Sequence, residues 1–361
     1  MKRVSELAND GKEIFCGIDL HERSMLAGVA IGRGDLNYHS LCTDDGGISR
    51  LIEILKSYRD KNAGSEVWVS YEASGCGFRL ADLLESEGFI VSVLAPTHLP
   101  TSPKRRSNKT DKRDVIRILE VLRGHVLAGN DLPAVWVPSA ELRDDREIVR
   151  RRLRLKEDST NVKNQIHGLL RRYGIRKPEW MKENWTKKHI RWLHSLETVL
   201  NPGASVVLMS LLRQLDFYEG ELIKVEQELI KLSEAERYKS RVEALIQIPG
   251  VGLLTAMVFL TELGDLSRFP NRRKLANYLG LVPRSWESGD QDDRKGHISK
   301  LGPSRVRKVL NQAAWLFVRY DPEFGRWFRE RTPKKKYRRK MITAVMRRLG
   351  ILMWHTALSA A

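Results

Sequence analysis

A long heptad pattern in the middle of the chain restricts the possible folds more than any other feature of the sequence. Apolar side chains recur there at alternating steps of three and four residues: Leu208, Leu211, Leu215, Tyr218, Leu222, Val225, Leu229 and Leu232. This spacing, sustained over more than three heptads, is typical of a coiled-coil helix. The segment 139–173 carries a second stripe with the same spacing: Val162, Ile166, Leu169 and Tyr173. The two stripes predict long helices that pair either as a hairpin within one chain or between chains.

The first third of the chain predicts a mixed α/β domain. Its strand-like and helical runs, in chain order, are strands at 14–20, 25–31 and 36–41, a helix at 48–58, a strand at 67–72, a helix at 77–86, a strand at 89–95 and a helix at 111–127. Three closely spaced strands predict an antiparallel meander, and strand–helix–strand–helix after them is the order of a ribonuclease-H-like fold. We therefore predict such a domain over 1–138, a coiled-coil helical region over 139–240 and a mainly helical domain over 241–361.

Four carboxylates lie at the ends of the predicted N-terminal elements. Asp19 and Glu72 each lie at a strand end, and Asp111 and Asp114 lie one helical turn apart at the start of a helix. Converging carboxylates repel one another, and a divalent cation that prefers hard oxygen ligands, such as Mg²⁺, relieves that repulsion. The pattern favours a Mg²⁺ site for phosphoryl transfer over four unrelated surface acids.

The charge balance predicts a nucleic-acid partner. Lysine and arginine total 63 against 45 acidic residues, which gives a net charge of +18. Such an excess favours binding to a polyanion. The candidate contacts are Lys104, Arg105, Arg106, Arg284, Lys295, Lys300 and Arg305. The arginine-dense stretch 143–154 is either a solvated helix face or a further surface that follows phosphates.

The cysteines and the hydropathy of the chain bear on its location. Cys16, Cys42 and Cys76 are odd in number and lack CxxC spacing, which argues against a disulfide framework and a zinc site. We expect them to be buried thiols in a reducing cytoplasm. The sequence has no signal peptide and no apolar run long enough to span a bilayer, so we expect a cytoplasmic protein with no membrane partner.

The last third contains two candidate phosphate-binding segments. IPGVG at 248–252, between two apolar helical runs, predicts a helix-hairpin-helix-like segment, in which glycines let backbone N–H groups approach a phosphate. An ordinary glycine turn between core helices is the alternative. The polar, glycine-rich stretch 284–302 predicts a loop in which Ser288 presents its hydroxyl beside Gly289. Basic neighbours there, such as Arg284, would stabilise charge that develops on a phosphate.

Several segments together resemble one known family. They are GIDLH around Asp19, YEASGCGF and LLESEGFIVSVLAP around and after Glu72, KTDKRD, IPGVGLLTA, ELGDLSRFPNRRKLANYLGLVPR and ESGDQDDRKGHISKLG. In order and spacing they are similar to the DEDD insertion-sequence transposases of the IS110 type, also described as bridge-RNA-guided recombinases. The resemblance covers nearly the whole chain. It implies a RuvC-like N-terminal domain, a coiled-coil middle and a C-terminal transposase domain.

The resemblance also implies roles for particular residues. By position, Asp19, Glu72, Asp111 and Asp114 would hold the metal, and Ser288 would attack DNA to give a covalent phosphoserine intermediate. The family has two glycines and a lysine after the serine, whereas here the acidic run 290–293 follows Gly289, so Ser285 is the alternative nucleophile. The resemblance therefore implies that the chain is an RNA-guided DNA transposase or recombinase.

The implied partners are donor and target DNA and a structured noncoding guide RNA. We also expect a homo-oligomer, a dimer or a tetramer, because the long helices separate the acids from the serine along the chain. Two other functions stay open: a metal-dependent DNA nuclease or junction resolvase without a covalent intermediate, and a catalytically inactive nucleic-acid-binding protein. The intact set of four acids argues against the last.

Overall fold

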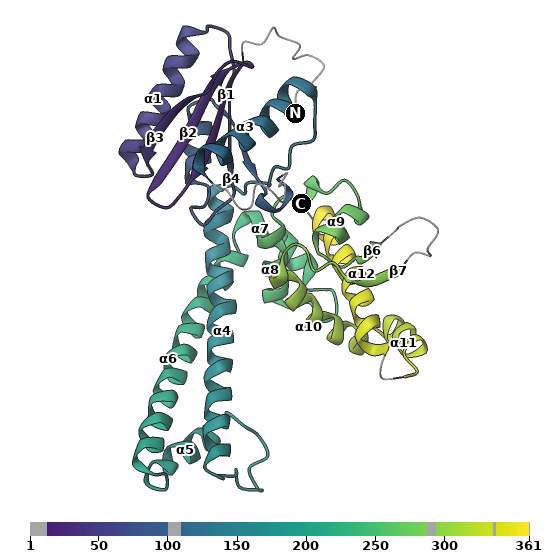
Figure 1. Ribbon diagram of the computed structural model, residues 1–361. Helices are drawn as coiled ribbons and strands as arrows, with labels where there is room; N and C mark the ends of the chain where they lie inside the picture. Colours follow the sequence, from purple (N-terminus) through teal and green to yellow (C-terminus); the bar gives the residue numbers. More distant parts are fainter. Residues whose placement is uncertain (1–12, 100–109, 287–293, 335–336, 361) are drawn as a thin grey trace. The chain divides into compact units, whose positions relative to one another are not determined.

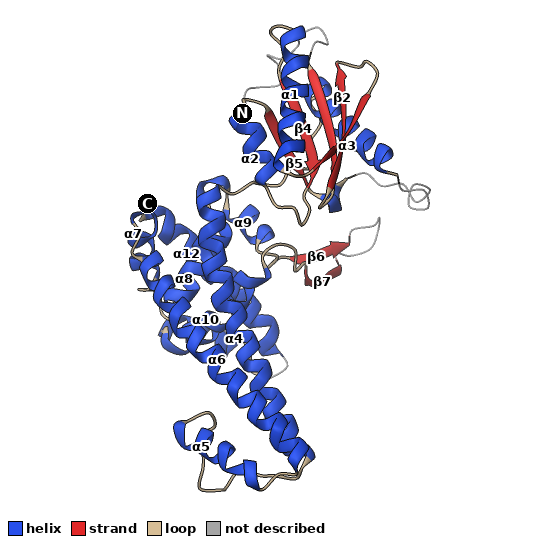
Figure 2. Ribbon diagram, turned by 90° about the vertical axis from the view of Figure 1, so that its left-hand side faces the viewer, coloured by secondary structure: helices blue, strands red, loops and turns tan. Residues whose placement is uncertain are grey.

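The computed structural model of the chain describes residues 13–99, 110–286, 294–334 and 337–360. These residues belong to two compact units, Met1–Val137 and Pro138–Ala361. The first unit is a mixed α/β unit and the second is almost entirely helical (Figure 2). The predicted combination of an N-terminal α/β part and a helical C-terminal part is therefore confirmed.

A five-stranded mixed sheet forms the centre of the first unit (Figure 1). Its strands are β1 (Ile14–Leu20), β2 (Ser24–Ile31), β3 (Asn37–Cys42), β4 (Val67–Glu72) and β5 (Ile90–Leu94). In the order β3-β2-β1-β4-β5, the pairs among the first three strands are antiparallel, whereas β1–β4 and β4–β5 are parallel. The predicted antiparallel meander is confirmed, and the order is consistent with a ribonuclease-H-like domain.

Helices cover both faces of this sheet because side chains alternate along its strands. On β1, Cys16 and Ile18 pack into the core that also holds side chains of α1 (Asp45–Lys61) and α2 (Arg79–Ser86). Phe15 points to the other face, where it packs against buried leucines of α3 (Asp111–Ala128). Cys16 is buried as expected, whereas Cys42 and Cys76 are exposed, at the end of the edge strand β3 and in the loop before α2. The expectation of three buried thiols is thus wrong for those two.

Two glycines let α3 lie directly on the sheet backbone. Gly17 on β1 pairs with Gly28 on β2. A Cβ on Gly17 would lie 2.8 Å from the carbonyl oxygen of Val115, and one on Gly28 would lie 2.5 Å from the Cγ1 of the same residue. Any larger side chain at either position would push the helix outward. This close packing fixes the start of α3 beside the ends of β1 and β4.

The second unit contains a long helical hairpin. Its two helices, α4 (Ala140–Arg172) and α6 (Pro202–Ser233), pack along each other, and the short helix α5 (Lys187–Ser195) lies at their far end (Figure 1). The buried side chains between them include Val162, Ile166, Leu208, Leu212 and Leu215. Pairing within one chain is therefore observed, while the coiled-coil geometry stays a prediction.

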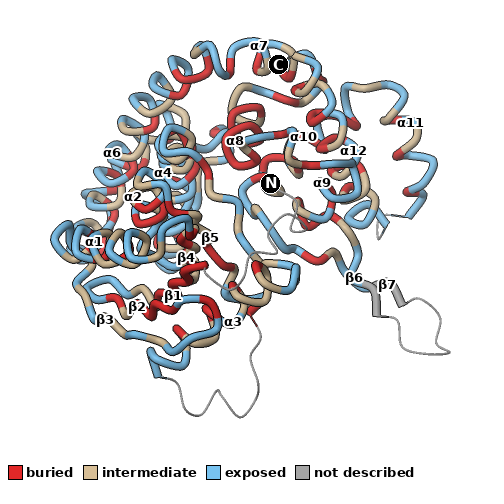
Figure 3. The backbone as a smooth tube through the Cα atoms, turned by 90° about the horizontal axis from the view of Figure 1, so that it is seen from above, coloured by how far each residue is buried: buried red, intermediate tan, exposed pale blue. Residues whose placement is uncertain are grey.

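The remaining helices share one hydrophobic core with α8 (Leu253–Leu263), whose residues from Ala256 onward are all buried (Figure 3). They are α7 (Glu236–Leu245), α9 (Arg272–Tyr278), α10 (Ser304–Tyr320), α11 (Pro322–Arg331) and α12 (Arg338–Ser359). Val149 and Leu153 of α4 belong to the same hydrophobic core. The hairpin and the C-terminal helices thus share a core, and a domain boundary at residue 240 stays a prediction.

The two candidate phosphate-binding segments have different outcomes. In the turn between α7 and α8, Gly250 has a φ of +83° and lies against α10, where a Cβ would be 2.7 Å from the Ala313 carbonyl oxygen. This turn therefore has a packing role, and a helix-hairpin-helix function stays a prediction.

The prediction of a loop over 284–302 is wrong in part, because β6 (Pro283–Trp286) and β7 (Arg294–Ile298) form an antiparallel pair. Backbone hydrogen bonds form this pair, and they need no alternating apolar pattern.

Among the described residues, no helix combines the length and the apolar composition that crossing a bilayer requires.

Candidate metal centre

The ends of two adjacent parallel strands place the first pair of acids. Ile18 of β1 pairs with Tyr71 of β4, so the next residues, Asp19 and Glu72, lie side by side. Asp19 follows Gly17 by two positions and therefore faces the side of the sheet that α3 covers. The sheet holds the two carboxylates rigidly, and α3 supplies the next groups.

The first turn of α3 carries the second pair of acids, Asp111 and Asp114. Backbone N–H groups at a helix start give that end partial positive charge, which stabilises nearby carboxylates. The Asp111 side chain is exposed, whereas only 14% of the Asp114 side chain is exposed. The helix start therefore presents one carboxylate to solvent and holds the other against the sheet.

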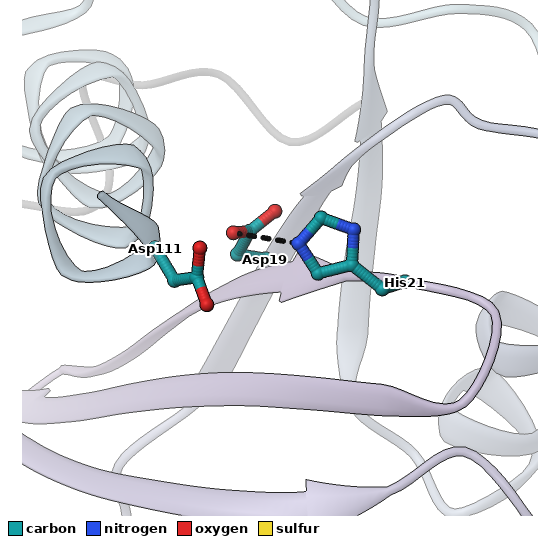
Figure 4. Close-up of side chains that lie close together, drawn as sticks. All are labelled: Asp19, His21 and Asp111. Carbon is teal, nitrogen blue, oxygen red and sulfur yellow. Dashed lines mark ion pairs between the residues drawn. The ribbon is translucent and has the colours of Figure 1, made fainter. Parts of the chain in front are cut away.

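Asp19, His21 and Asp111 form one group (Figure 4). One ligand atom from each lies within 4.8 Å of the others, and His21 Nε2 is 3.3 Å from Asp19 Oδ2. The Asp19 side chain is 15% exposed and that of His21 is 50% exposed. The group is thus anchored in the sheet and open to solvent on one side, as a site that receives both an ion and a large substrate requires.

Arg117 connects the other two acids. It lies one turn further along α3, where its guanidinium bonds to a Glu72 carboxylate oxygen and lies 3.3 Å from Asp114 Oδ1. Only 17% of the Arg117 side chain is exposed. The four predicted acids are therefore arranged as two pairs, Asp19 with Asp111 beside His21, and Glu72 with Asp114 around a shared arginine.

His21 and Arg117 are absent from the predicted site, although local spacing offered a signal for each. His21 lies two residues after Asp19, and in an extended chain residues two positions apart point to the same face. Arg117 lies three residues after Asp114, which places both on one face of a helix. Neither spacing alone distinguishes a site residue from an ordinary surface residue.

The donor atoms of the Asp19 group fit a divalent cation. Carboxylate oxygens suit Mg²⁺ and Mn²⁺, and an imidazole nitrogen suits the transition metals more than Mg²⁺. The group can thus hold a divalent metal ion, and its histidine widens the range of ions that it accepts. Beside His21 a cavity of about 560 Å³ opens, lined also by Glu22, Thr43, Ser74 and Arg79.

Several predicted site residues do not belong to the part of the chain that the structure describes. Ser288 and the basic run 104–106 are not among the described residues, and the side chains of Ser285 and Lys295 are not described either.

The predicted contacts whose side chains are described have local surroundings of their own. Arg284 is exposed, and its guanidinium donates a 3.2 Å hydrogen bond to the Ser299 carbonyl oxygen. Lys300 is exposed and has a φ of +56°. Arg305 lies 3.7 Å from the carboxylate of Glu262, which is 5% exposed. Arg305 therefore already has a structural partner.

Sequence comparisons connect this geometry to a family. A profile for DEDD transposases matches residues 16–175, and one described as "Transposase IS116/IS110/IS902 family" matches residues 242–329. A putative transposase of Sinorhizobium fredii is 31% identical over 94% of this chain and 79% of its own length. The transposase of insertion sequence element IS1111A from Coxiella burnetii is 30% identical over 64% of this chain and 61% of its own. A pilin gene-inverting protein of Moraxella bovis is 27% identical over 77% and 76%. The acid-lined sheet edge and these matches together show that the chain belongs to the IS116/IS110/IS902 family of DNA transposases.

Proposed function

We propose that the chain cuts and rejoins DNA at the acid centre to move an insertion sequence. The observation that carries this proposal is the convergence of Asp19, Asp111 and His21 at the meeting point of β1 and α3. The family membership supplies the reaction class, and the +18 net charge supplies attraction for DNA. The cavity beside His21 offers space for a substrate group next to the reacting phosphate.

Each residue of the centre has a distinct task in this proposal. Asp19 and Asp111 hold a divalent cation, Mg²⁺ in the cell, with Glu72 and Asp114 as the further ligands. When bound, the cation withdraws negative charge from the phosphate. Arg117 orients Glu72 and Asp114 and reduces their mutual repulsion.

Ser288 is the nucleophile in the proposed reaction, with Ser285 as the alternative. Its Oγ forms a bond to phosphorus, the bond from phosphorus to one deoxyribose oxygen breaks, and the serine proton ends on that oxygen. The phosphoserine conserves the phosphodiester energy, so a second DNA hydroxyl can reverse the step and rejoin strands. Support comes from the family resemblance and from the basic residues Arg284, Lys295 and Lys300 nearby in sequence.

The proposal includes two kinds of partner beyond DNA. The resemblance supports a structured noncoding RNA that selects the DNA by base pairing, and the basic composition is compatible with it. A homo-oligomer would let the acid centre of one protomer act with the serine of another. Mixing an Asp19→Asn protein with a Ser288→Ala protein tests this, since shared sites restore activity in the mixture and separate sites do not.

The central experiment replaces one carboxylate in the group. Asp19→Asn keeps the shape of the side chain but removes a negative charge from the cation site. Loss of an outer-shell partner of a metal costs up to about 100-fold, so loss of a direct ligand should lower DNA strand cutting by more than about 100-fold. Calorimetric Mn²⁺ binding weakens in parallel. The control is Asp60→Asn, which changes an exposed acid on α1. Unchanged cutting by Asp19→Asn contradicts the proposed centre.

A trapping experiment separates the remaining functions. Labelled DNA is incubated with protein, the reaction is denatured, and modified peptides are mapped. An adduct on Ser288 supports the proposal, and one on Ser285 moves the nucleophile. Cut DNA with no adduct instead supports a metal-dependent nuclease, and DNA binding without any cutting supports a catalytically inactive binding protein.

A further inference from the structure

The far end of the helical hairpin concentrates positive charge. This hairpin tip, residues 171–191, spans the end of α4, the connecting loop and the first half of α5 (Figure 1). It contains eight lysines and arginines against two glutamates, a net charge of +6, whereas the whole chain carries +18. About a third of the excess charge thus lies in a short segment.

The cations of the hairpin tip are available to a partner. Seven of them are exposed: Arg171, Arg172, Arg176, Lys182, Lys187, Lys188 and Arg191. None of these seven forms an ion pair with another residue in the part of the chain that the structure describes. Unpaired cations gathered on one small surface repel each other, so a polyanion that binds there gains the relief of that repulsion.

Exposed aromatic rings lie among these cations. Trp180 is 70% exposed and Tyr173 is 46% exposed. Lys177 fixes the loop that presents Trp180, because its ammonium donates hydrogen bonds to the Lys182 carbonyl oxygen at 3.0 Å and to Asn184 Oδ1 at 2.7 Å. Large rings exposed on a fixed loop offer flat surfaces on which unpaired bases stack.

A cavity of about 400 Å³ opens in the same tip. Arg171, Arg176 and Lys177 line it together with the rings of His167 and Trp192. The cavity therefore combines cations with ring faces, which are the two kinds of group that hold a nucleotide.

A buried, hydrogen-bonded histidine lies in the lining of this cavity. His189 also lines it, is 1% exposed, and accepts a 3.1 Å hydrogen bond at Nδ1 from the Trp185 backbone N–H. Burial, with the nearby Lys177, holds the pKa of His189 below its usual range, which favours the neutral ring. Trp185 itself has a φ of +66°, a conformation that is strained for a non-glycine residue and concentrates at functional sites.

We propose that the hairpin tip binds an unpaired strand of nucleic acid, with bases stacked on Trp180 and Tyr173 and phosphates held by the surrounding cations. Exposed rings and a base-sized cavity recognise bases that are out of a helix, whereas a duplex keeps its bases stacked inside. This site consists of residues separate from the Asp19 group and needs no metal. An RNA loop and a melted DNA strand share the chemistry that it recognises.

Fluorescence anisotropy with labelled oligouridylate, oligothymidylate and a DNA duplex tests the proposal on the full chain. Trp180→Ala with Tyr173→Ala weakens binding of the single strands by about tenfold or more and leaves the salt dependence unchanged. Arg176→Ala, Lys182→Ala and Lys188→Ala together lower the slope of log K against log salt by about 2, since each lost phosphate contact on a single strand removes about 0.7.

The matched control is Phe217→Ala with Lys224→Ala and Lys231→Ala. It removes an exposed aromatic and two exposed lysines further along α6. A loss for both single strands, or for oligouridylate alone, in the tip variants supports the site, and the second result assigns it to RNA. Equal losses in tip and control variants, a loss confined to the duplex, or no loss at all overturns it. Asp19→Asn binds these oligonucleotides at least as tightly as wild type, so failure here is distinct from failure of the acid centre.

Discussion

Both ends of α4 carry arginines, but the arginines at the two ends have opposite surroundings. At the base, Arg146, Arg150 and Arg152 bond to groups of other helices. At the hairpin tip, Arg171 and Arg172 are exposed and make no ion pair with a described residue. The sequence left open whether the base is a solvated face or a surface that follows phosphates, and Arg146, Arg150 and Arg152 there already have partners within the protein. Charge density in a sequence therefore does not locate a binding surface until the internal partners are known.

The base of α4 is held to α7 and α8 by a buried polar network. Arg150 bonds both oxygens of Glu262, at 2.8 and 2.9 Å, and Arg146 bonds the Thr261 carbonyl oxygen at 2.7 Å. Asp145, 3% exposed, accepts two bonds from Arg237 and one from the Tyr238 hydroxyl. Burial and the bond to Asp145 raise the pKa of Tyr238, so the hydroxyl stays a donor. These groups therefore stabilise the packing of α4 against α7 and α8.

The largest expected effect is at Glu262. Glu262→Gln leaves the Arg150 guanidinium without its carboxylate, and breaking a buried pair of this kind costs about 3–5 kcal/mol of unfolding free energy. Urea unfolding followed by circular dichroism measures the loss. Glu228→Gln is the control, because Glu228 forms an exposed pair with Lys231. If the two substitutions cost the same, the base of α4 is no more structural than a surface pair.

The same carboxylate predicts a pH dependence. Burial alone would raise the pKa of Glu262, but the hydrogen bonds and charge of Arg150 outweigh it and hold the pKa below its usual range. A carboxylate whose pKa is lower in the folded state than in the unfolded state stabilises the fold at a pH above its unfolded pKa of about 4.3. That stabilisation is lost as the pH falls through the folded-state pKa. The urea midpoint of wild type therefore falls more steeply below about pH 4 than that of Glu262→Gln. Parallel pH profiles would exclude this linkage.

The ion pair of Arg152 is intermediate in burial between the polar network at the base of α4 and the exposed cations of the hairpin tip. Its guanidinium bonds Glu226 Oε1 from two nitrogens, at 3.0 and 2.6 Å, and Glu226 is 45% exposed. Arg152→Ala therefore lowers the unfolding free energy by about 0.5–1 kcal/mol, the upper part of the range for pairs in contact with water. The measurement is the same urea series. A loss as large as that of Glu262→Gln would place Arg152 in the buried network.

The smallest effect on stability is expected at the hairpin tip. Replacing Arg176, Lys182 and Lys188 by alanine changes the unfolding free energy by less than about 0.5 kcal/mol, because exposed side chains without ion pairs contribute little. Thermal unfolding of this variant beside the wild type checks it. A loss of several kcal/mol would show that the tip cations stabilise the fold, and the contrast with the base would disappear.

Local patterns in the sequence predicted most of the first unit. Strand runs such as 14–20 and 67–72 combine β-branched and aromatic residues with clear ends, and the structure has strands over the same residues. The heptad stripe predicted α6, but Leu211 of that stripe is only half-buried, whereas Leu212, which lies outside the stripe, is buried. A helix that packs on two neighbours at its two ends does not keep one strict seam, so the exact face needs the tertiary structure.

The pairing within the candidate site was beyond sequence reasoning. The spacing of Asp111 and Asp114 predicted one shared helix face, but which acid meets Asp19 depends on how α3 packs across Gly17 and Gly28. The role of Arg117 follows from the same packing, since it reaches Glu72 from another element. Long-range placement of this kind leaves no periodic signal in the chain.

The arrangement around Arg117 has a consequence for how the protein meets DNA. The four carboxylates at these strand and helix ends, two of them bonded to Arg117, place negative charge at the site within a chain of net charge +18. A phosphodiester is therefore attracted at long range and repelled in the last few ångströms, over distances shorter than the roughly 8 Å screening length at physiological salt. Holding DNA and cutting it are thus opposed electrostatic tasks, assigned to different residues. A variant that loses one of these carboxylates should bind DNA more tightly than wild type, although it no longer cuts the DNA.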